Sequence, residues 1–155
     1  MINVVFVCLG NICRSPMAEA VFRSMVQADG LEKQINVDSA GTSDWHIGDA
    51  PHKGTLEILQ KYNISAEGMK SRQYVKEDLD AFDYIIAMDQ SNIENMEAIQ
   101  DRQSPKLIKL LDLIPDVSQK DVPDPYFTGD FDETYELVTK GCQELLRRIK
   151  IENKL

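Results

Sequence analysis

The sequence has few cysteines and no long apolar run. Its three cysteines are an odd number, which excludes a framework of paired disulfides. No apolar run approaches the ~20 residues of a membrane-spanning helix. The first residues also lack the charged segment that is typical of a signal peptide. These absences predict a cytoplasmic protein with no part in a membrane.

Positive charge is also scarce, because 17 Lys and Arg face 26 Asp and Glu, which gives a net charge of −9. This balance disfavours nucleic acids and anionic membranes as partners. Any attraction for an anion must therefore come from a few residues around its binding site. The 155 residues are 43% hydrophobic, which predicts one globular domain, residues 1–155, with its own core.

Strand and helix patterns alternate along the chain. Apolar runs rich in β-branched residues predict strands at 2–7, 35–41, 84–88 and 106–111. Apolar residues at helical spacing predict helices from Pro16 to Asp29, at 51–62, after Asp89 and from Phe131 onward, with a short helix at 75–81. This alternation is typical of a doubly wound α/β domain.

Local patterns add detail to this outline. Ser15, Asp89 and Asp130 are each placed to cap a helix, the last with Glu133 as an acidic capping box. Within the 51–62 helix, we expect Leu56 and Leu59 to face inward. Residues 120–129 are rich in proline and aspartate and are predicted to form a loop.

Residues 8–15, Cys-Leu-Gly-Asn-Ile-Cys-Arg-Ser, lie between the first predicted strand and the first helix, and we call them the phosphate loop. A helix N-terminus and successive loop amides bind anions, and Arg14 adds a planar fork that matches two phosphate oxygens. These groups favour the thiolate form of Cys8. The predicted phosphate-binding residues are Leu9, Gly10, Asn11, Ile12, Cys13, Arg14 and Ser15.

Further candidate residues follow the second and fourth predicted strands, namely Trp45 after residues 35–41 and Asp124 after residues 106–111. Loops after parallel strands meet at one edge of the sheet, so both residues can reach Cys8. Asp124, between two prolines, is a stiffly held carboxylic acid that can protonate an aryl oxide as it leaves. Asp121 is its nearest competitor. No metal ion is needed, because Arg14 and the loop amides carry the developing charge.

The string CLGNICRS at 8–15 and the Asp-Pro-Tyr at 124–126 strongly resemble the low-molecular-weight protein tyrosine phosphatases of the bacterial type, over essentially the whole chain. The resemblance implies a three-layer, flavodoxin- or Rossmann-like fold, with a four-stranded parallel sheet flanked by helices. It also implies hydrolysis of phosphotyrosine in proteins, without a cofactor or metal ion.

The resemblance carries residue roles as well. Cys8 matches the nucleophile, Arg14 the group that stabilises the transition state, and Asp124 the general acid and base. Ser15 corresponds to a serine that hydrogen-bonds the thiolate. Asn11 matches the asparagine that holds the loop in a left-handed turn, with Ser39 as its supporting serine. Trp45 and Tyr126 match the aromatic walls that flank the substrate ring. Phe127 stands where some members have a second tyrosine.

Three other functions compete with this one. Related phosphatases that act on phosphoarginine have the loop CTGNTCRS, whereas Leu9 and Ile12 are apolar here and favour an aromatic ring. Arsenate reductases of the same fold need further cysteines, and this chain has none between Ser15 and Gly141. A phosphate-binding module without catalysis would need neither Cys8 nor Asp124.

The remaining cysteines and histidines have simpler interpretations. Cys13 either packs within the loop or forms a reversible disulfide with oxidised Cys8, which would make the protein redox-sensitive. Cys142 stands at helical spacing among core residues. His46 and His52 are expected at the surface.

Overall fold

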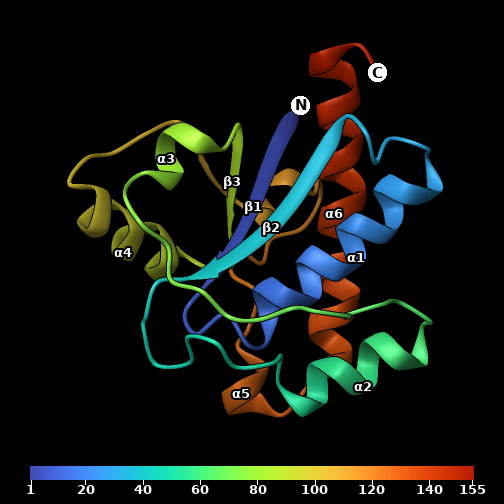
Figure 1. The fold of residues 1–155 in the computed structure, drawn as a ribbon, viewed down its shortest axis with the longest axis vertical. Helices are drawn as coiled ribbons and strands as arrows, with labels where there is room; N and C mark the ends of the chain where they lie inside the picture. Colours follow the sequence, from blue (N-terminus) through green and yellow to red (C-terminus); the bar gives the residue numbers. More distant parts are fainter.

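The computed structural model describes residues 1–155 and contains one four-stranded sheet. Its strands are β1 (Ile2–Cys8), β2 (Ile35–Gly41), β3 (Tyr84–Ala87) and β4 (Leu107–Lys109). All neighbouring strands are parallel, in the order β2-β1-β3-β4 (Figure 1). The predicted parallel α/β sheet is therefore confirmed.

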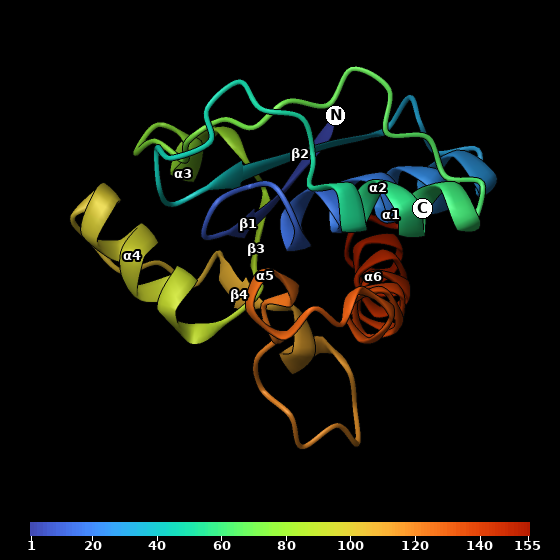
Figure 2. The same ribbon diagram turned by 90° about the horizontal axis from the view of Figure 1, so that it is seen from below.

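Helices cover both faces of the sheet (Figure 2). One face packs against α1 (Arg14–Ala28), α2 (Lys53–Lys61) and the long α6 (Phe131–Asn153), and the other packs against α3 (Asp78–Ala81) and α4 (Gln90–Gln100). No helix is both long and apolar enough to cross a lipid bilayer.

Strand β1 is buried on both faces because it lies in the middle of the sheet. Val4 and Phe6 belong to the core under α1 and α6, whereas Val5 and Val7 belong to the core under α3 and α4. This two-sided burial explains why the sequence shows a continuous apolar run instead of an alternating one. The strand ends at Cys8, which pairs with Gly41 of β2, one residue beyond the last pair with β3.

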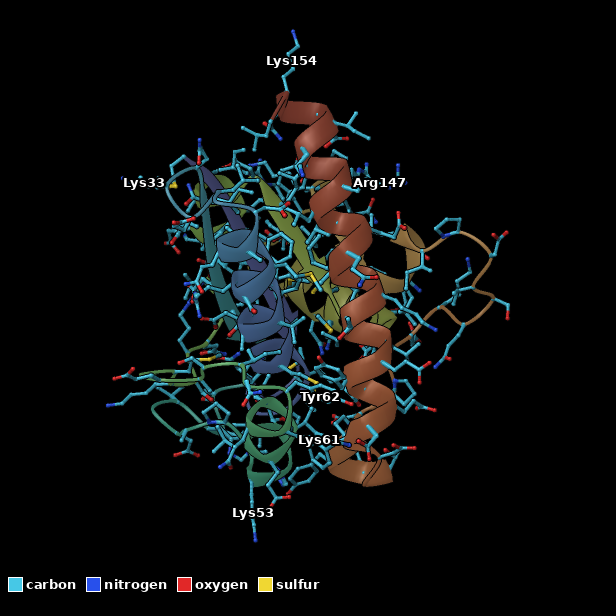
Figure 3. All side chains as sticks on the ribbon, turned by 90° about the vertical axis from the view of Figure 1, so that its right-hand side faces the viewer. Lys33, Lys53, Lys61, Tyr62, Arg147 and Lys154 are labelled. Carbon is cyan, nitrogen blue, oxygen red and sulfur yellow. The ribbon has the colours of Figure 1, made fainter.

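Helix α2 is tied to α6 by aromatic stacking. The ring centroids of Tyr62 and Tyr135 are 4.0 Å apart and the rings are nearly parallel, and Lys61 approaches Asp132 to 3.8 Å. Figure 3 shows Lys61 and Tyr62 between α2 and α6. On the inner side of α2, Ile58 and Leu59 are buried. The prediction for Leu56 is wrong, because the buried positions Thr55, Ile58 and Leu59 define a face that excludes it.

The predicted boundaries differ from the structure in the last third of the chain. Strand β4 has three residues and passes into a 3₁₀ turn, η1 (Leu110–Leu113), because Leu110 and Leu111 are buried in the core that α6 covers. The predicted 120–129 loop contains a short helix, α5 (Pro125–Thr128), whose N-cap is Asp124. The caps at Asp89 and Asp130 are formed as predicted, although only Asp89 has both bonds of a capping box.

Gly41, the last residue of β2, allows the phosphate loop to pass close to the sheet. A Cβ atom there would lie 2.9 Å from the Leu9 carbonyl oxygen and 3.0 Å from the Asn11 nitrogen. Both are main-chain atoms, so they could move only if the loop changed its shape. Gly141 in α6 is still more crowded, but there the neighbour is the side chain of Leu110.

We predict that Gly41→Ala and Gly141→Ala both lower the free energy of unfolding by about 1–3 kcal/mol, because both overpack the interior. Only Gly41→Ala should also weaken the binding of inorganic phosphate, by roughly tenfold, because it moves the loop N–H groups. Urea unfolding and calorimetric titration measure the two effects. Equal phosphate affinities in the two variants would contradict this account of Gly41.

Candidate active site

The phosphate loop lies at the carboxyl end of β1. The strand order reverses beside this strand, since β2 lies on one side of it and β3 and β4 on the other. It surrounds a cavity of about 130 Å³. The lining residues come from the phosphate loop, the loop after β2 and the segment around α5: Cys8, Leu9, Gly10, Ile12, Cys13, Trp45, His46, Asp124, Tyr126 and Phe127.

Most backbone N–H groups of the phosphate loop have no hydrogen-bond acceptor within the protein. The N–H groups of Leu9, Gly10, Ile12, Cys13, Arg14 and Ser15 donate to no group of the protein. The N–H of Asn11 points to the sulfur of Cys8, at 3.3 Å. Unpaired backbone N–H groups in a buried loop are costly unless an anion accepts from them. The loop is therefore built to receive an oxyanion next to Cys8.

A chain of hydrogen bonds holds the loop in this shape. Asn11 has a φ of 56°, the left-handed region, and its side-chain amide donates to Ser15 at 2.7 Å and to Ser39 at 2.9 Å. The Ser15 hydroxyl lies 3.0 Å from the Cys8 sulfur. The prediction that Ser15 caps α1 is wrong, because Cys13 holds that position and the Ser15 hydroxyl faces Cys8.

Arg14 is 2% exposed and is fixed by groups from two segments, the one between β3 and α4 and the loop before α5. Its Nη1 donates to Asp89 at 2.6 Å and to the Val122 carbonyl at 2.9 Å, and its Nη2 lies 3.4 Å from Asp124. Burial opposes its charge, but Cys8 and these carboxylates outweigh burial and raise the pKa of Arg14. Its Nε is buried and has no partner, so it remains available to a bound anion.

The structure separates the two candidate aspartates. Asp124 lines the cavity, and its Oδ1 accepts from the N–H of Tyr126 at 3.0 Å. Asp121 lies outside the cavity lining, where it accepts from Lys109 at 3.3 Å and from the N–H of Gln90 at 3.1 Å. Asp124 is therefore the carboxylate that faces Cys8.

The rim of the cavity is aromatic. Trp45, Tyr126 and Phe127 line it and are largely exposed, so their rings are accessible to a ligand. Both histidines are partly exposed, as expected, but each also has a specific contact. His46 lines the cavity beside Gly10 and pairs with Asp49, while His52 caps α2 and stacks on Phe131 at 5.1 Å.

The other two cysteines are buried thiols. Burial, together with the nearby Cys8 and Asp124, raises the pKa of Cys13 to about 12, although Arg14 acts in the opposite direction. Burial alone raises the pKa of Cys142, which lies in the core between α1 and α6. A disulfide between Cys8 and Cys13 stays a prediction. No group of three or more His, Cys, Asp or Glu side chains is arranged to hold a metal ion.

Sequence reasoning missed two supports of the loop. Asp89 was expected only as a helix cap, yet its other carboxylate oxygen binds Arg14. Its position directly after β3, at the edge of the sheet where Cys8 lies, was the available signal. Ser71 and Arg72, which contact Asn11, lie in a segment between α2 and α3 that has no motif.

Comparisons with known proteins agree with this geometry. A family model described as low molecular weight phosphotyrosine protein phosphatase matches residues 3–155. The chain is 53% identical, over all of both chains, to the low molecular weight protein-tyrosine-phosphatase YfkJ of Bacillus subtilis. It is 49% identical to PtpA of Staphylococcus epidermidis, over 94% of this chain and 92% of the relative.

Solved structures show the same likeness. The crystal structure of Bacillus subtilis YfkJ matches with a TM-score of 0.96 at 52% identity, covering 98% of this chain and 96% of that one. A Drosophila arginine phosphatase matches with a TM-score of 0.86 at 32% identity, covering 95% and 97%. With its phosphate loop, its buried arginine and its cavity-lining aspartate in place, the chain belongs to the low molecular weight phosphotyrosine protein phosphatase family.

Proposed function

We propose that residues 1–155 act as a single-domain protein-tyrosine-phosphatase, which hydrolyses phosphotyrosine in proteins through a cysteinyl-phosphate intermediate. One observation carries the proposal. The sulfur of Cys8 faces a loop whose N–H groups, apart from that of Asn11, have no acceptor, beside an arginine whose Nε is buried and unpaired. These donors match the oxygens of a phosphoryl group, and the sulfur is placed to attack its phosphorus.

In the first half of the reaction, the Cys8 thiolate attacks phosphorus while the bond to the phenolic oxygen breaks. Asp124 donates its proton to that oxygen, because a phenol has a pKa of about 10 and leaves slowly as the anion. The loop N–H groups and Arg14 stabilise the charge on the three remaining oxygens. The products are tyrosine and phosphorylated Cys8.

In the second half, a water molecule attacks the phosphorus of the intermediate. Asp124, now a carboxylate, takes a proton from that water, and the phosphorus–sulfur bond breaks. Cys8 leaves as a thiolate, which the Ser15 hydroxyl stabilises at 3.0 Å. Inorganic phosphate is released. The chain's own donors carry the charge in both halves, so we propose a reaction without a cofactor.

The substrate ring is proposed to lie between Trp45 and Tyr126, with Ile12 beside its stem. We further propose that the enzyme acts on phosphoproteins of the cytoplasm, where reducing conditions keep Cys8 as a free thiol. Arsenate reduction is less well supported. The third cysteine, Cys142, is fully buried under α1 and cannot receive a disulfide without unfolding of the core.

We predict that Asp124→Asn slows hydrolysis of phenyl phosphate on the order of 10²–10⁴-fold, because no proton reaches the leaving oxygen. Aryl phosphates with more acidic phenols should lose less in the phosphoryl-transfer step, which single-turnover kinetics isolates. Asp121→Asn is the matched control and should behave as wild type. Equal losses for both kinds of substrate would assign Asp124 a structural role, and a leaving-group effect in Asp121→Asn would show that the wrong aspartate has been chosen.

Substrate choice gives a second prediction, since phosphoarginine is the alternative substrate and one structural neighbour is an arginine phosphatase. Ile12 offers no partner to a guanidinium N–H, and leaving that N–H unpaired costs roughly 1–3 kcal/mol, about 5- to 150-fold in rate. Wild type should therefore prefer phosphotyrosine peptides to phosphoarginine peptides in kcat/KM.

Ile12→Thr should narrow this preference, and phosphoserine peptides should be poor substrates of both forms because their stem is short. Peptides that carry the three phosphoresidues in one sequence, assayed at equal enzyme concentration, measure the ratios. Equal rates on phosphotyrosine and phosphoarginine in wild type, or an unchanged ratio in Ile12→Thr, would refute the assignment to tyrosine.

The ion pair between Arg14 and Asp89 gives a third prediction. Burial raises the pKa of Asp89, but the hydrogen bond and charge of Arg14 outweigh burial, so the pKa lies below its ordinary value. A lowered pKa stabilises the fold above about pH 4, and this stabilisation is lost as the pH falls through the folded-state pKa.

Asp89→Asn should therefore lower the free energy of unfolding by about 1–3 kcal/mol at pH 7. The difference in unfolding free energy between the two proteins should narrow as the pH falls below about 4, because the wild type then loses the contribution of ionised Asp89. Urea unfolding of both proteins at several pH values measures the gap. A gap that is constant or widens on acidification would contradict the role of this pair.

A further inference from the structure

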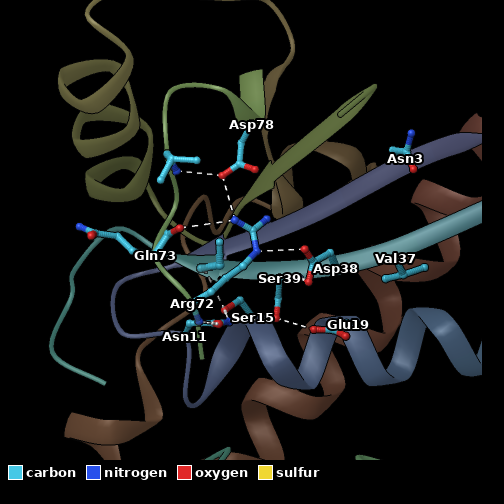
Figure 4. A network of polar contacts seen from close by, with 12 residues as sticks. Asn3, Asn11, Ser15, Glu19, Val37, Asp38, Ser39, Arg72, Gln73 and Asp78 are labelled. Atoms are coloured by element: carbon cyan, nitrogen blue, oxygen red, sulfur yellow. Dashed lines mark hydrogen bonds and ion pairs between the residues drawn. The ribbon is translucent and has the colours of Figure 1, made fainter. Parts of the chain in front are cut away.

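The segment before α3 reaches across to the phosphate loop at Asn11. Ser71 donates its hydroxyl to the Asn11 main-chain carbonyl at 2.5 Å, and the N–H of Arg72 donates to the Asn11 side-chain carbonyl at 3.0 Å. Two consecutive residues therefore hold both carbonyl groups of Asn11. Figure 4 shows Arg72 beside Asn11, Ser15 and Ser39.

The bond from Arg72 decides which way the Asn11 amide faces. Because the carbonyl end accepts from Arg72, the NH₂ end is turned toward Ser15 and Ser39. A serine hydroxyl that accepts from this NH₂ group has its own proton free to donate. The Cys8 sulfur lies 3.0 Å from the Ser15 oxygen, closer than the Ala40 carbonyl at 3.4 Å. The Ser15 hydroxyl is therefore directed at Cys8.

Arg72 is itself fixed on both sides. Its Nε donates to Asp38 and its Nη1 to Asp78, each at 3.0 Å (Figure 4). Its main-chain carbonyl accepts from the N–H of Gly41 at 2.9 Å. Asp78 is buried and also accepts from the N–H of Val75 at 2.8 Å. The two carboxylates thus clamp the guanidinium against the edge of β2, where the Arg72 N–H meets Asn11.

We propose that Arg72 is a positioning residue of the phosphatase reaction. Held by Asp38 and Asp78, it orients the Asn11 amide, and through that amide it directs the Ser15 hydroxyl to the thiolate of Cys8. The inference rests on the proposed function. It adds that two carboxylates at the edge of the sheet, neither of which reaches the cavity, control the reactivity of the nucleophile.

A direct electrostatic effect of Arg72 on Cys8 is the competing explanation. The ionisable side chains that line the cavity with Cys8 are Cys13, His46 and Asp124, and Arg14 is paired with Asp124. Arg72 forms no hydrogen bond or ion pair with any of these groups. The two explanations predict opposite effects of Asp78→Asn on the thiolate fraction of Cys8. Removing a negative charge should favour the thiolate if only charge matters, but it should disfavour the thiolate if the clamp on Arg72 matters.

The experiment measures the pH at which half of Cys8 reacts with iodoacetamide, with the modified residue identified by mass spectrometry. Asp78→Asn should raise this midpoint by on the order of half a pH unit, since outright loss of a hydrogen bond to a charged group is worth about one to two units. Asp80→Asn is the matched control. It makes the same charge change on the same helix, where Asp80 pairs only with Arg102, and its midpoint should not rise.

Arg72→Gln should raise the midpoint too and lower kcat for an aryl phosphate, and Arg72→Lys should fall between Arg72→Gln and wild type because one ammonium cannot pair equally with both carboxylates. Asp38→Asn, at a more exposed site, repeats the test should Asp78→Asn fail to fold. A midpoint that is unchanged or lower in a folded Asp78→Asn or Asp38→Asn protein would overturn the proposal. Alkylation needs no turnover, so this result stands apart from any failure of the proposed function.

Discussion

The structure depends on a loop that keeps its N–H groups away from the protein's own acceptors. Residues 9–15 stay open toward Cys8 because Asn11 adopts the left-handed region and is held by Ser39, Ser71 and Arg72. Without those contacts, the unpaired N–H groups would turn to nearby carbonyls or to water. In the proposed reaction, a bound phosphoryl group offsets the cost of keeping them unpaired, so the same atoms would bind the substrate and stabilise the transition state.

The charged side chains near the phosphate loop also favour anion binding, although the chain has a net charge of −9. Arg14 is the cation at the centre, and Asp89 aligns one of its nitrogens while leaving Nε free. The pairing orients the guanidinium for an anion instead of neutralising it fully. Asp124 approaches the other terminal nitrogen of the same guanidinium, and the proposed reaction uses its carboxyl to exchange a proton with the leaving oxygen or with water. An acidic protein can therefore bind phosphate because the attraction is confined to one loop.

Much of this could be predicted from the sequence, and the failures have physical reasons. Strand β1 and the phosphate loop are contiguous, and their apolar run and motif are local signals, so both were predicted correctly. The helix-cap role of Ser15 was predicted wrongly, because a serine before a proline is a good local cap signal, whereas its contact with Cys8 had been implied by the family resemblance and is present. Asp89 and Arg72 act across long sequence separations, through contacts that no local pattern encodes.

The central claim is that Cys8 forms a covalent bond to phosphorus during turnover. Asp124→Asn, mixed with an aryl phosphate that has an acidic phenol and quenched in acid within milliseconds, should accumulate phosphoenzyme because the attack of water on the intermediate is slowed. Peptide mapping by mass spectrometry should then place one phosphoryl group on Cys8. Release of the phenol with no phosphorylated Cys8 at any quench time, or a phosphoryl group on another residue, would contradict the account.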